Sequence, residues 1–127
     1  MNKSIYLAGG MKNNWRYGFI QNSENWKIYD PQKHNLKDSK NYTSWDIKAV
    51  KKSDIILGYI EKDNVSGYGL CVEIGYGKAL GKTIIWVEED RKSERNKYFG
   101  MCRELADYIF YDINEAFEFI NRNVDIL

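Results

Sequence analysis

The chain has 127 residues, 43% of them hydrophobic and 15% aromatic, and this length and composition predict one domain with a single core. Its 19 Lys and Arg residues nearly balance its 18 Asp and Glu residues, which excludes the basic excess of a nucleic-acid-binding protein. No apolar run is long enough for a membrane span or a signal peptide, so we expect a cytoplasmic protein with no membrane partner.

The two cysteines and the single histidine do not form a metal-binding pattern. Cys71 and Cys102 lie far apart in the sequence, and His34 stands alone in a polar stretch. A transition-metal site needs several such residues at close spacing. We therefore expect reduced thiols, as in a cytosolic protein, and neither a metal nor a cofactor. The sequence gives no reason to assign a role to His34.

The N-terminal part predicts two short strands with a helix between them. The first strand runs straight into Gly9 and Gly10, and the N–H groups of a glycine pair can approach a ligand closely. A tight turn explains the same pair without a ligand. The predicted elements are a strand over Ser4–Ala8, a helix over Asn13–Ile20 capped by Asn14, and a strand over Trp26–Tyr29.

The stretch that follows the only proline is harder to interpret. Residues 32–41 are polar, rich in lysine and without periodicity, and they predict a long loop that is either mobile or part of a site. Thr43–Asp46 matches a capping box, which predicts that a helix begins there and runs to about Lys52. A place in this capping box would by itself explain Asp46.

The remaining chain alternates strands and helices, joined by short links. This alternation predicts an α/β domain: a flavodoxin-like, doubly wound sheet of about five mostly parallel strands with helices on both faces. Ligands of such sheets bind at the carboxyl ends of the strands, near the switch in strand order. The predicted elements are a strand over Ile55–Ile60, a helix within 66–81, a strand over Thr83–Val87, a charged surface loop over Glu88–Lys97, a helix over Tyr98–Leu105, a strand over Asp107–Tyr111 and an amphipathic helix over Ile113–Ile120.

The segment 66–81 holds five of the ten glycines and one acidic residue, Glu73. In a helix, Gly69 and Gly77 lie one turn on either side of Glu73 and share its face. A carboxylate without bulky neighbours is open to a ligand. The ordinary alternative is an acid that simply favours the start of a helix.

Three stretches of sequence together resemble one enzyme family. They are IYLAGG near the N-terminus, SDIILGYI before the glycine-rich segment, and GYGLCVEIGYGKALGK around Glu73, with similarity from Ile5 to about Lys82. These stretches are similar to those of nucleoside 2-deoxyribosyltransferases, which are related to deoxynucleoside 5′-monophosphate N-glycosidases. The resemblance implies that residues 1–127 form one nucleoside 2-deoxyribosyltransferase-like domain, in a homo-oligomer of at least two chains.

The resemblance also implies roles for individual residues. Glu73 matches the nucleophile that forms a covalent deoxyribosyl ester, and Asp46 matches the aspartate that contacts the base and handles its proton. Tyr6 matches the strand tyrosine that orients the nucleophile, although a strand tyrosine often just packs in the core. The residues expected to contact the substrate are Gly9, Gly10, Ser66, Gly67 and Gly69.

The chemistry of N-glycosidic cleavage suits these residue types. Breaking the bond builds oxocarbenium character on the sugar, which a carboxylate stabilises or captures. The leaving base needs a proton, best supplied by an acid whose pKa burial has raised. Flat walls on which a base stacks are expected from the aromatic side chains Trp15, Trp45, Tyr59 and Tyr68.

Two positions depart from the family pattern. Many transferases carry an acid six positions before the nucleophile to contact sugar hydroxyls, but this chain has Gly67 there and Ser66 beside it. The monophosphate glycosidases often hold the 5′-phosphate with a serine where this chain has Gly10, although Lys12, Arg16 and loop amides remain available to an anion. We therefore favour deoxyribose transfer between nucleobases, with monophosphate hydrolysis or non-catalytic nucleotide sensing as alternatives.

Overall fold

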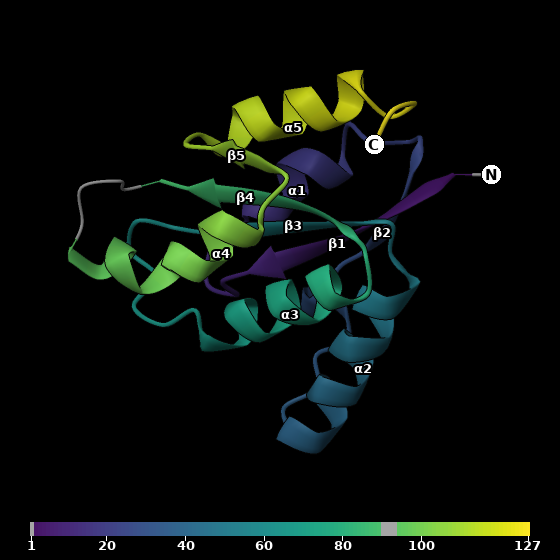
Figure 1. The fold of residues 1–127 in the computed structure, drawn as a ribbon. Coiled ribbons are helices and arrows are strands. Elements are labelled where there is room, and N and C mark those ends of the chain that lie inside the picture. The colour runs from purple at the N-terminus through teal and green to yellow at the C-terminus, as the bar shows by residue number, and fades with distance from the viewer. Residues whose placement is uncertain (1, 90–93) are drawn as a thin grey trace.

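The computed structural model describes residues 2–89 and 94–127, which form a five-stranded parallel sheet with helices on both faces (Figure 1). This confirms the predicted α/β class. Among the described residues, no helix is both long and apolar enough to cross a membrane. The elements in order are β1 (Lys3–Gly9), α1 (Trp15–Ile20), β2 (Trp26–Tyr29), the 3₁₀ helix η1 (Pro31–Lys33), α2 (Ser39–Lys52), β3 (Ile55–Ile60), α3 (Tyr68–Ala79), β4 (Thr83–Glu88), the 3₁₀ helix η2 (Glu94–Phe99), α4 (Gly100–Leu105), β5 (Tyr108–Phe110) and α5 (Ile113–Arg122).

The strand order, β2-β1-β3-β4-β5, places the switch between β1 and β3. The chain passes from β1 to β2 on one side and then crosses to β3 on the other. Gly9 at the end of β1 is in register with Tyr59 of β3, so the two strands end side by side. Connections that diverge at such a point leave room for a ligand beyond the strand ends. The topology therefore positions a site before any side chain is considered.

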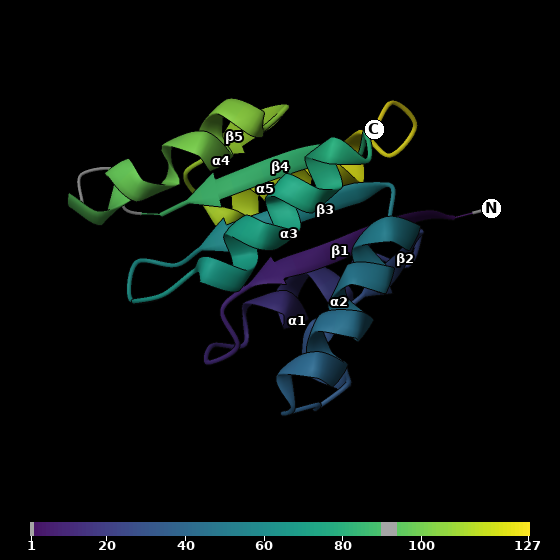
Figure 2. The same ribbon diagram turned by 60° about the horizontal axis from the view of Figure 1, so that its bottom comes forward.

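Strand alternation divides the core into two layers, one on each face of the sheet. Figures 1 and 2 show the helices that cover these two faces. Ile5 and Leu7 of β1 pack into the layer that contains α1 and α5, and Tyr6 packs into the opposite layer with residues of α2, α3 and α4. Successive side chains of a strand point to opposite faces. The pleat of β1 therefore directs Tyr6 to the same face as α3, where Glu73 lies.

Two glycines allow α3 to lie close to β3. A Cβ atom added at Gly58 would lie 2.7 Å from Ile74 Cδ1, and one added at Gly77 would lie 2.8 Å from Ile56 Cγ1. Gly77 is therefore a packing residue and does not leave space beside Glu73, contrary to the prediction from the sequence. Gly69 does face open space, because a Cβ there meets nothing within 4 Å.

The prediction for the start of α2 is wrong. The helix begins at Ser39, and the side chain of Asp38 accepts a hydrogen bond from the backbone N–H of Asn41 at 3.3 Å. Thr43–Asp46 therefore lies inside the helix and is not its capping box. The predicted loop over 32–41 is confined to the residues between the end of η1 at Lys33 and the start of α2 at Ser39. The first turns of α2 are exposed to solvent. An exposed helical turn lacks the apolar periodicity from which a sequence pattern predicts a helix.

Three smaller predictions concern the cap of α1, the start of α4 and the charged loop after β4. Asn14 occupies the N-cap position of α1, but its side chain makes no capping hydrogen bond. The helix predicted over 98–105 becomes regular only at Gly100, after the 3₁₀ turns of η2. The charged loop predicted over 88–97 includes residues 90–93, which lie outside the described residues.

Cys71 of α3 and Cys102 of α4 are free thiols that contact each other. Their sulfur atoms lie 3.6 Å apart, with the Cys102 thiol as the donor. This hydrogen bond lowers the pKa of Cys71 to about 7. The two thiols are therefore chemically distinct although they share one interface between helices.

The two glycines Gly77 and Gly75 provide a matched test of the packing of α3. Ala at Gly77 must push Ile56 aside, so we predict a loss of about 1–3 kcal/mol in the free energy of unfolding. Ala at Gly75 meets nothing within 4 Å and should add about 0.5–1 kcal/mol through its higher helix propensity. Urea unfolding of both variants measures the difference, and equal stabilities would contradict the close packing of α3 on β3.

Candidate active site

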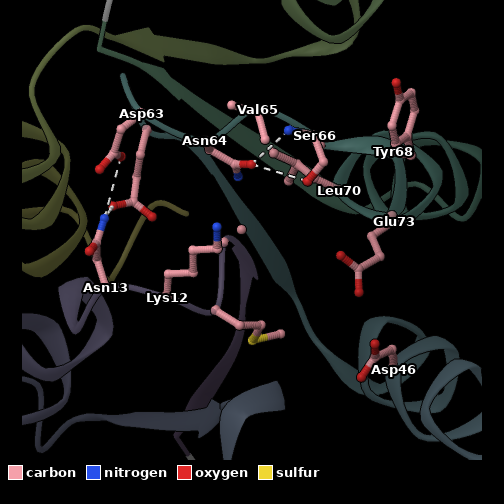
Figure 3. A pocket seen from close by; sticks show the side chains of 16 residues that line it. Lys12, Asn13, Asp46, Asp63, Asn64, Val65, Ser66, Tyr68, Leu70 and Glu73 are labelled. Atoms are coloured by element: carbon pink, nitrogen blue, oxygen red, sulfur yellow. Dashed lines mark hydrogen bonds between the residues drawn. The ribbon is translucent and has the colours of Figure 1, made fainter. Parts of the chain in front are cut away.

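A cavity of about 440 Å³ lies at the carboxyl ends of β1 and β3. Figure 3 shows the carboxylates of Glu73 and Asp46 close together at one end, with Asn13 and Asp63 at the other. The cavity therefore occupies the place that the strand order indicates. Its lining residues are Gly9, Gly10, Met11, Lys12, Asn13, Asp46, Glu61, Asp63, Asn64, Val65, Ser66, Gly67, Tyr68, Gly69, Leu70 and Glu73.

The contact at the centre of the site joins β1 to α3. Tyr6 is fully buried, and its hydroxyl donates a hydrogen bond to Oε2 of Glu73. A fully buried tyrosine hydroxyl needs a partner, and a charged acceptor makes the hydrogen bond stronger. The contact fixes the orientation of the Glu73 side chain at the wall of the cavity.

Burial makes Glu73 an unusually weak acid. Its pKa rises from 4.5 to about 7, chiefly because the surrounding protein removes water from the carboxylate. The hydrogen bond from Tyr6 opposes this rise, the negative charge of Asp46 adds to it, and the positive charge of Arg16 opposes it. Near neutral pH, Glu73 is therefore divided between its protonated form and a poorly solvated, reactive carboxylate.

Asp46 enters the site from the middle of α2 and is held by a residue that the sequence did not indicate. His34 Nε2 lies 3.0 Å from Asp46 Oδ1, and the two side chains are 9% and 17% exposed. Burial raises the pKa of Asp46, whereas its hydrogen bonds with His34 and Tyr6 lower it. His34, to which the sequence analysis assigned no role, therefore contacts a candidate catalytic residue. Pairs of residues far apart in sequence cannot be recognised from spacing alone.

The loop of Gly9 and Gly10 is organised by Arg16, which the sequence left available to an anion. The guanidinium is only 1% exposed and donates to the carbonyl oxygens of Leu7, Gly9 and Gly10 at 3.0, 3.0 and 2.8 Å. It is thus committed to the protein and does not reach a ligand. Gly9 has φ of 153°, and a Cβ there would lie 2.7 Å from the carbonyl oxygen of Tyr59. Only glycine fits this tight strand end.

The start of α3 contributes backbone more than side chains to the cavity. Gly67 is the N-cap residue with φ of 107°, a left-handed conformation that favours glycine. Ser66 does not point freely into the site, because its hydroxyl donates to Asn64 Oδ1 at 3.1 Å. Gly69 leaves the wall open above the first turn. All three line the cavity, but none provides a charged group.

Glu61 is a cavity residue that sequence reasoning missed. It follows β3 directly, is 6% exposed and accepts a hydrogen bond from the Asn13 side chain. Asn13 also donates to Asp63 Oδ1 at 3.4 Å, so two carboxylates share this end of the cavity. A Cβ at Gly10 would lie 2.9 Å from Glu61 Oε1, so a larger residue there would displace the Glu61 carboxylate. The signal available in the sequence was an acid directly after a strand that ends at the switch point.

Only one of the four predicted aromatic walls lines the cavity. Tyr68 does so, and its side chain is largely exposed. Trp15 packs against Tyr59 with ring centroids 5.1 Å apart, and Trp45 packs against His34. None of these three rings is among the residues that line the cavity.

The comparison with protein families decides the relationship. Residues 2–91, more than half of the chain, match the family described as nucleoside 2-deoxyribosyltransferase like. The chain belongs to this family. The match includes β1, α2, β3 and α3, the elements that carry Tyr6, Asp46 and Glu73. No sequence among the curated proteins matches the chain.

Solved structures of similar fold agree with the family. A 2-deoxyribosyltransferase from Leishmania mexicana is similar with a TM-score of 0.71 at 20% identity, over 98% of this chain and 99% of that one. A 2-deoxyribosyltransferase from Bacillus psychrosaccharolyticus gives 0.68 at 20% identity, over 95% of each chain. A CMP N-glycosidase from Clostridium botulinum gives 0.60 at 20% identity, over 94% of this chain and 99% of that one. This 2-deoxyribosyltransferase-like protein therefore shares their fold.

In this 2-deoxyribosyltransferase-like protein, we predict that Glu73 titrates near pH 7. Tyr6→Phe removes the donor that stabilises the carboxylate, so the pKa of Glu73 should rise further. Carboxyl-carbon NMR titration measures the pKa of Glu73 in the unmodified protein and in Tyr6→Phe. Tyr76→Phe, on the same helix as Glu73, is the control and should leave this pKa unchanged. An ordinary pKa near 4.5, or an unchanged pKa in Tyr6→Phe, would contradict the proposed contact.

Proposed function

We propose that this protein cleaves the N-glycosidic bond of 2′-deoxynucleosides and transfers the deoxyribosyl group to a second nucleobase through an ester on Glu73. The observation that carries the proposal is the buried Tyr6–Glu73 hydrogen bond beside Asp46, at the switch-point cavity. Membership of the 2-deoxyribosyltransferase-like family supports it. The fold it shares with the proteins from Leishmania mexicana and Bacillus psychrosaccharolyticus, which are named 2-deoxyribosyltransferases, also supports the proposal.

In the first half-reaction, a carboxylate oxygen of Glu73 attacks C1′ of the sugar. The C1′–N bond breaks, the base leaves with the electron pair, and a C1′–O bond to Glu73 forms. Tyr6 holds Oε2 and leaves Oε1 for the attack. Because burial has removed water from the carboxylate, the developing positive charge on the sugar gains more from it than it would in solution.

Asp46 handles the proton that the leaving base requires. Burial raises its pKa, which increases the fraction of the protonated acid that donates to a ring nitrogen. The negative charge of Asp46 raises the pKa of Glu73, so the protonation of one carboxyl affects that of the other. The productive state has the proton on Asp46 and the charge on Glu73.

The second half-reaction reverses the first with a different base. A nitrogen of the incoming base attacks C1′, the ester bond to Glu73 breaks, and Asp46 recovers the proton. Transfer requires the ester to outlive the exchange of bases, so water must be kept away. The close packing of α3 on β3 and the fully buried Tyr6 support a dry nucleophile side of the cavity.

The charge of the lining favours an uncharged substrate over a nucleotide. Among the residues that the structure describes, the lining holds four acids, Asp46, Glu61, Asp63 and Glu73, and one basic residue, Lys12. Arg16 favours the charged forms of Glu73 and Asp46 from behind the cavity wall, but its donors are occupied by backbone carbonyls and do not reach a phosphate. A 5′-phosphate would carry further negative charge into this environment.

Lys12 is the observation that favours a second candidate, hydrolysis of a deoxynucleoside 5′-monophosphate. Lys12 lines the cavity (Figure 3), and an ammonium group is a common phosphate ligand. The Clostridium structure is named a CMP N-glycosidase. This reaction uses the same Glu73 and Asp46, with water as the acceptor.

The nucleophile is tested by Glu73→Gln, which should reduce turnover about a thousandfold or more while the fold is retained. Incubation with a 2′-deoxynucleoside and a second free base, followed by chromatography, separates three outcomes. An exchanged nucleoside indicates transfer, free sugar indicates hydrolysis, and binding without product indicates a sensor. Glu104→Gln, an exposed acid on α4, is the control and should leave turnover unchanged. Activity that survives in Glu73→Gln would refute the mechanism.

The charge argument predicts that a 2′-deoxynucleoside has a kcat/KM at least about tenfold above that of its 5′-monophosphate. Glu61→Gln removes one negative charge and should narrow this preference, whereas Lys12→Gln should widen it. Steady-state kinetics on both substrates measures the ratios. A preference for the monophosphate that Lys12→Gln abolishes would instead establish the second candidate.

A further inference from the structure

His34 is fixed at both of its ring nitrogens and on its face. Nε2 lies 3.0 Å from Asp46 Oδ1, and Nδ1 accepts the backbone N–H of Leu36 at 2.9 Å. Trp45 packs against the ring at 64°, with centroids 4.8 Å apart. Asn35, with φ of 51°, turns the chain so that the Leu36 amide reaches back to the ring. Asparagine adopts this left-handed conformation more readily than most residues.

These contacts determine which nitrogen carries the proton. A neutral imidazole has one donor nitrogen and one acceptor nitrogen. Because Nδ1 accepts the Leu36 amide, the proton is on Nε2 and points at Asp46. The histidine is therefore a donor to Oδ1 of Asp46, whose side chain lines the cavity.

We propose that His34 is a positioning residue that holds Asp46 by Oδ1 and so fixes the orientation in which its carboxyl group meets the nucleobase. The inference rests on the proposed function, in which Asp46 exchanges a proton with the base. Asp46 projects from the middle of a helix and is not restrained by a cap, so its rotamer depends on such a partner. A carboxyl fixed in orientation transfers a proton more effectively than one that rotates.

The other groups facing Asp46 determine the sign of the effect on its titration. Tyr6 from β1 and Glu73 from α3 adjoin it, and the Arg16 charge from α1 reaches it. Of these groups, His34, Tyr6 and Arg16 favour the charged form, whereas the charge of Glu73 opposes it. Loss of the His34 donor alone therefore raises the pKa of Asp46.

The kinetic test compares His34→Ala with His34→Gln. The glutamine amide can place a donor near the position of Nε2, whereas alanine leaves Oδ1 without one. We expect His34→Ala to lower kcat/KM for a 2′-deoxynucleoside by about ten- to a hundredfold and His34→Gln to recover most of it. Lys33→Ala, an exposed neighbour, is the control. Equal activity in both His34 variants, whether low or unchanged, would overturn the proposal.

A second measurement separates this proposal from the proposed function. Carboxyl-carbon NMR titration of Asp46 needs no turnover, and His34→Ala should raise its pKa while His34→Gln restores it. If the unmodified protein converts no deoxynucleoside but Asp46 titrates in this way, the reaction is wrong and the positioning contact is right. If the protein is active and the pKa of Asp46 does not change in His34→Ala, the positioning role is wrong.

Discussion

The hydrogen bond from Tyr6 to Glu73 depends on almost every feature of the fold. It requires β1 and β3 to lie side by side, so that a helix following β3 crosses the end of β1. It also requires the pleat of β1 to point Tyr6 towards α3. Gly58 and Gly77 bring α3 close to β3, within reach of the tyrosine hydroxyl. A shift of one residue in β1 would turn Tyr6 to the opposite face and remove the contact.

The Tyr6–Glu73 contact lies in a group of two acidic side chains and one buried basic side chain. Glu73 and Asp46 are both poorly solvated, and burial raises the pKa of each. One fully buried cation, Arg16, stabilises their charged forms from behind while its donors hold the loop after β1. Tyr6 and His34 each donate to one of the carboxyls. Burial thus raises the pKa of both acids while the nearby donors and the Arg16 charge oppose the rise, and an acid with a raised pKa suits general acid–base chemistry.

Sequence reasoning predicted the parts of this arrangement that are local or follow from topology. Strand alternation and short links were sufficient for the sheet, and the glycine pattern drew attention to Glu73. Tyr6, Asp46 and Glu73 do lie together at the switch point, as the family resemblance implied. Their chemical roles remain a proposal.

The features that were missed depend on tertiary contacts. The start of α2 was misplaced because its first turns are exposed and show no apolar period. His34 was overlooked because its partner is on another element, and Arg16 was left available because its carbonyl acceptors are not visible in a sequence. Glu61 was missed because its burial depends on the loop after β1 packing over it. Each omission concerns a polar group whose partner is set by the fold.

Mass spectrometry of a trapped intermediate tests the central claim most directly. A 2′-deoxy-2′-fluoronucleoside slows release of the sugar ester, because fluorine destabilises the oxocarbenium-like transition state of the second step. After incubation and digestion, the account predicts one fluorodeoxyribosyl group on the peptide that contains Glu73, and none in Glu73→Gln. Cleavage of an ordinary deoxynucleoside with no trapped sugar, or with the sugar on another residue, would contradict the account.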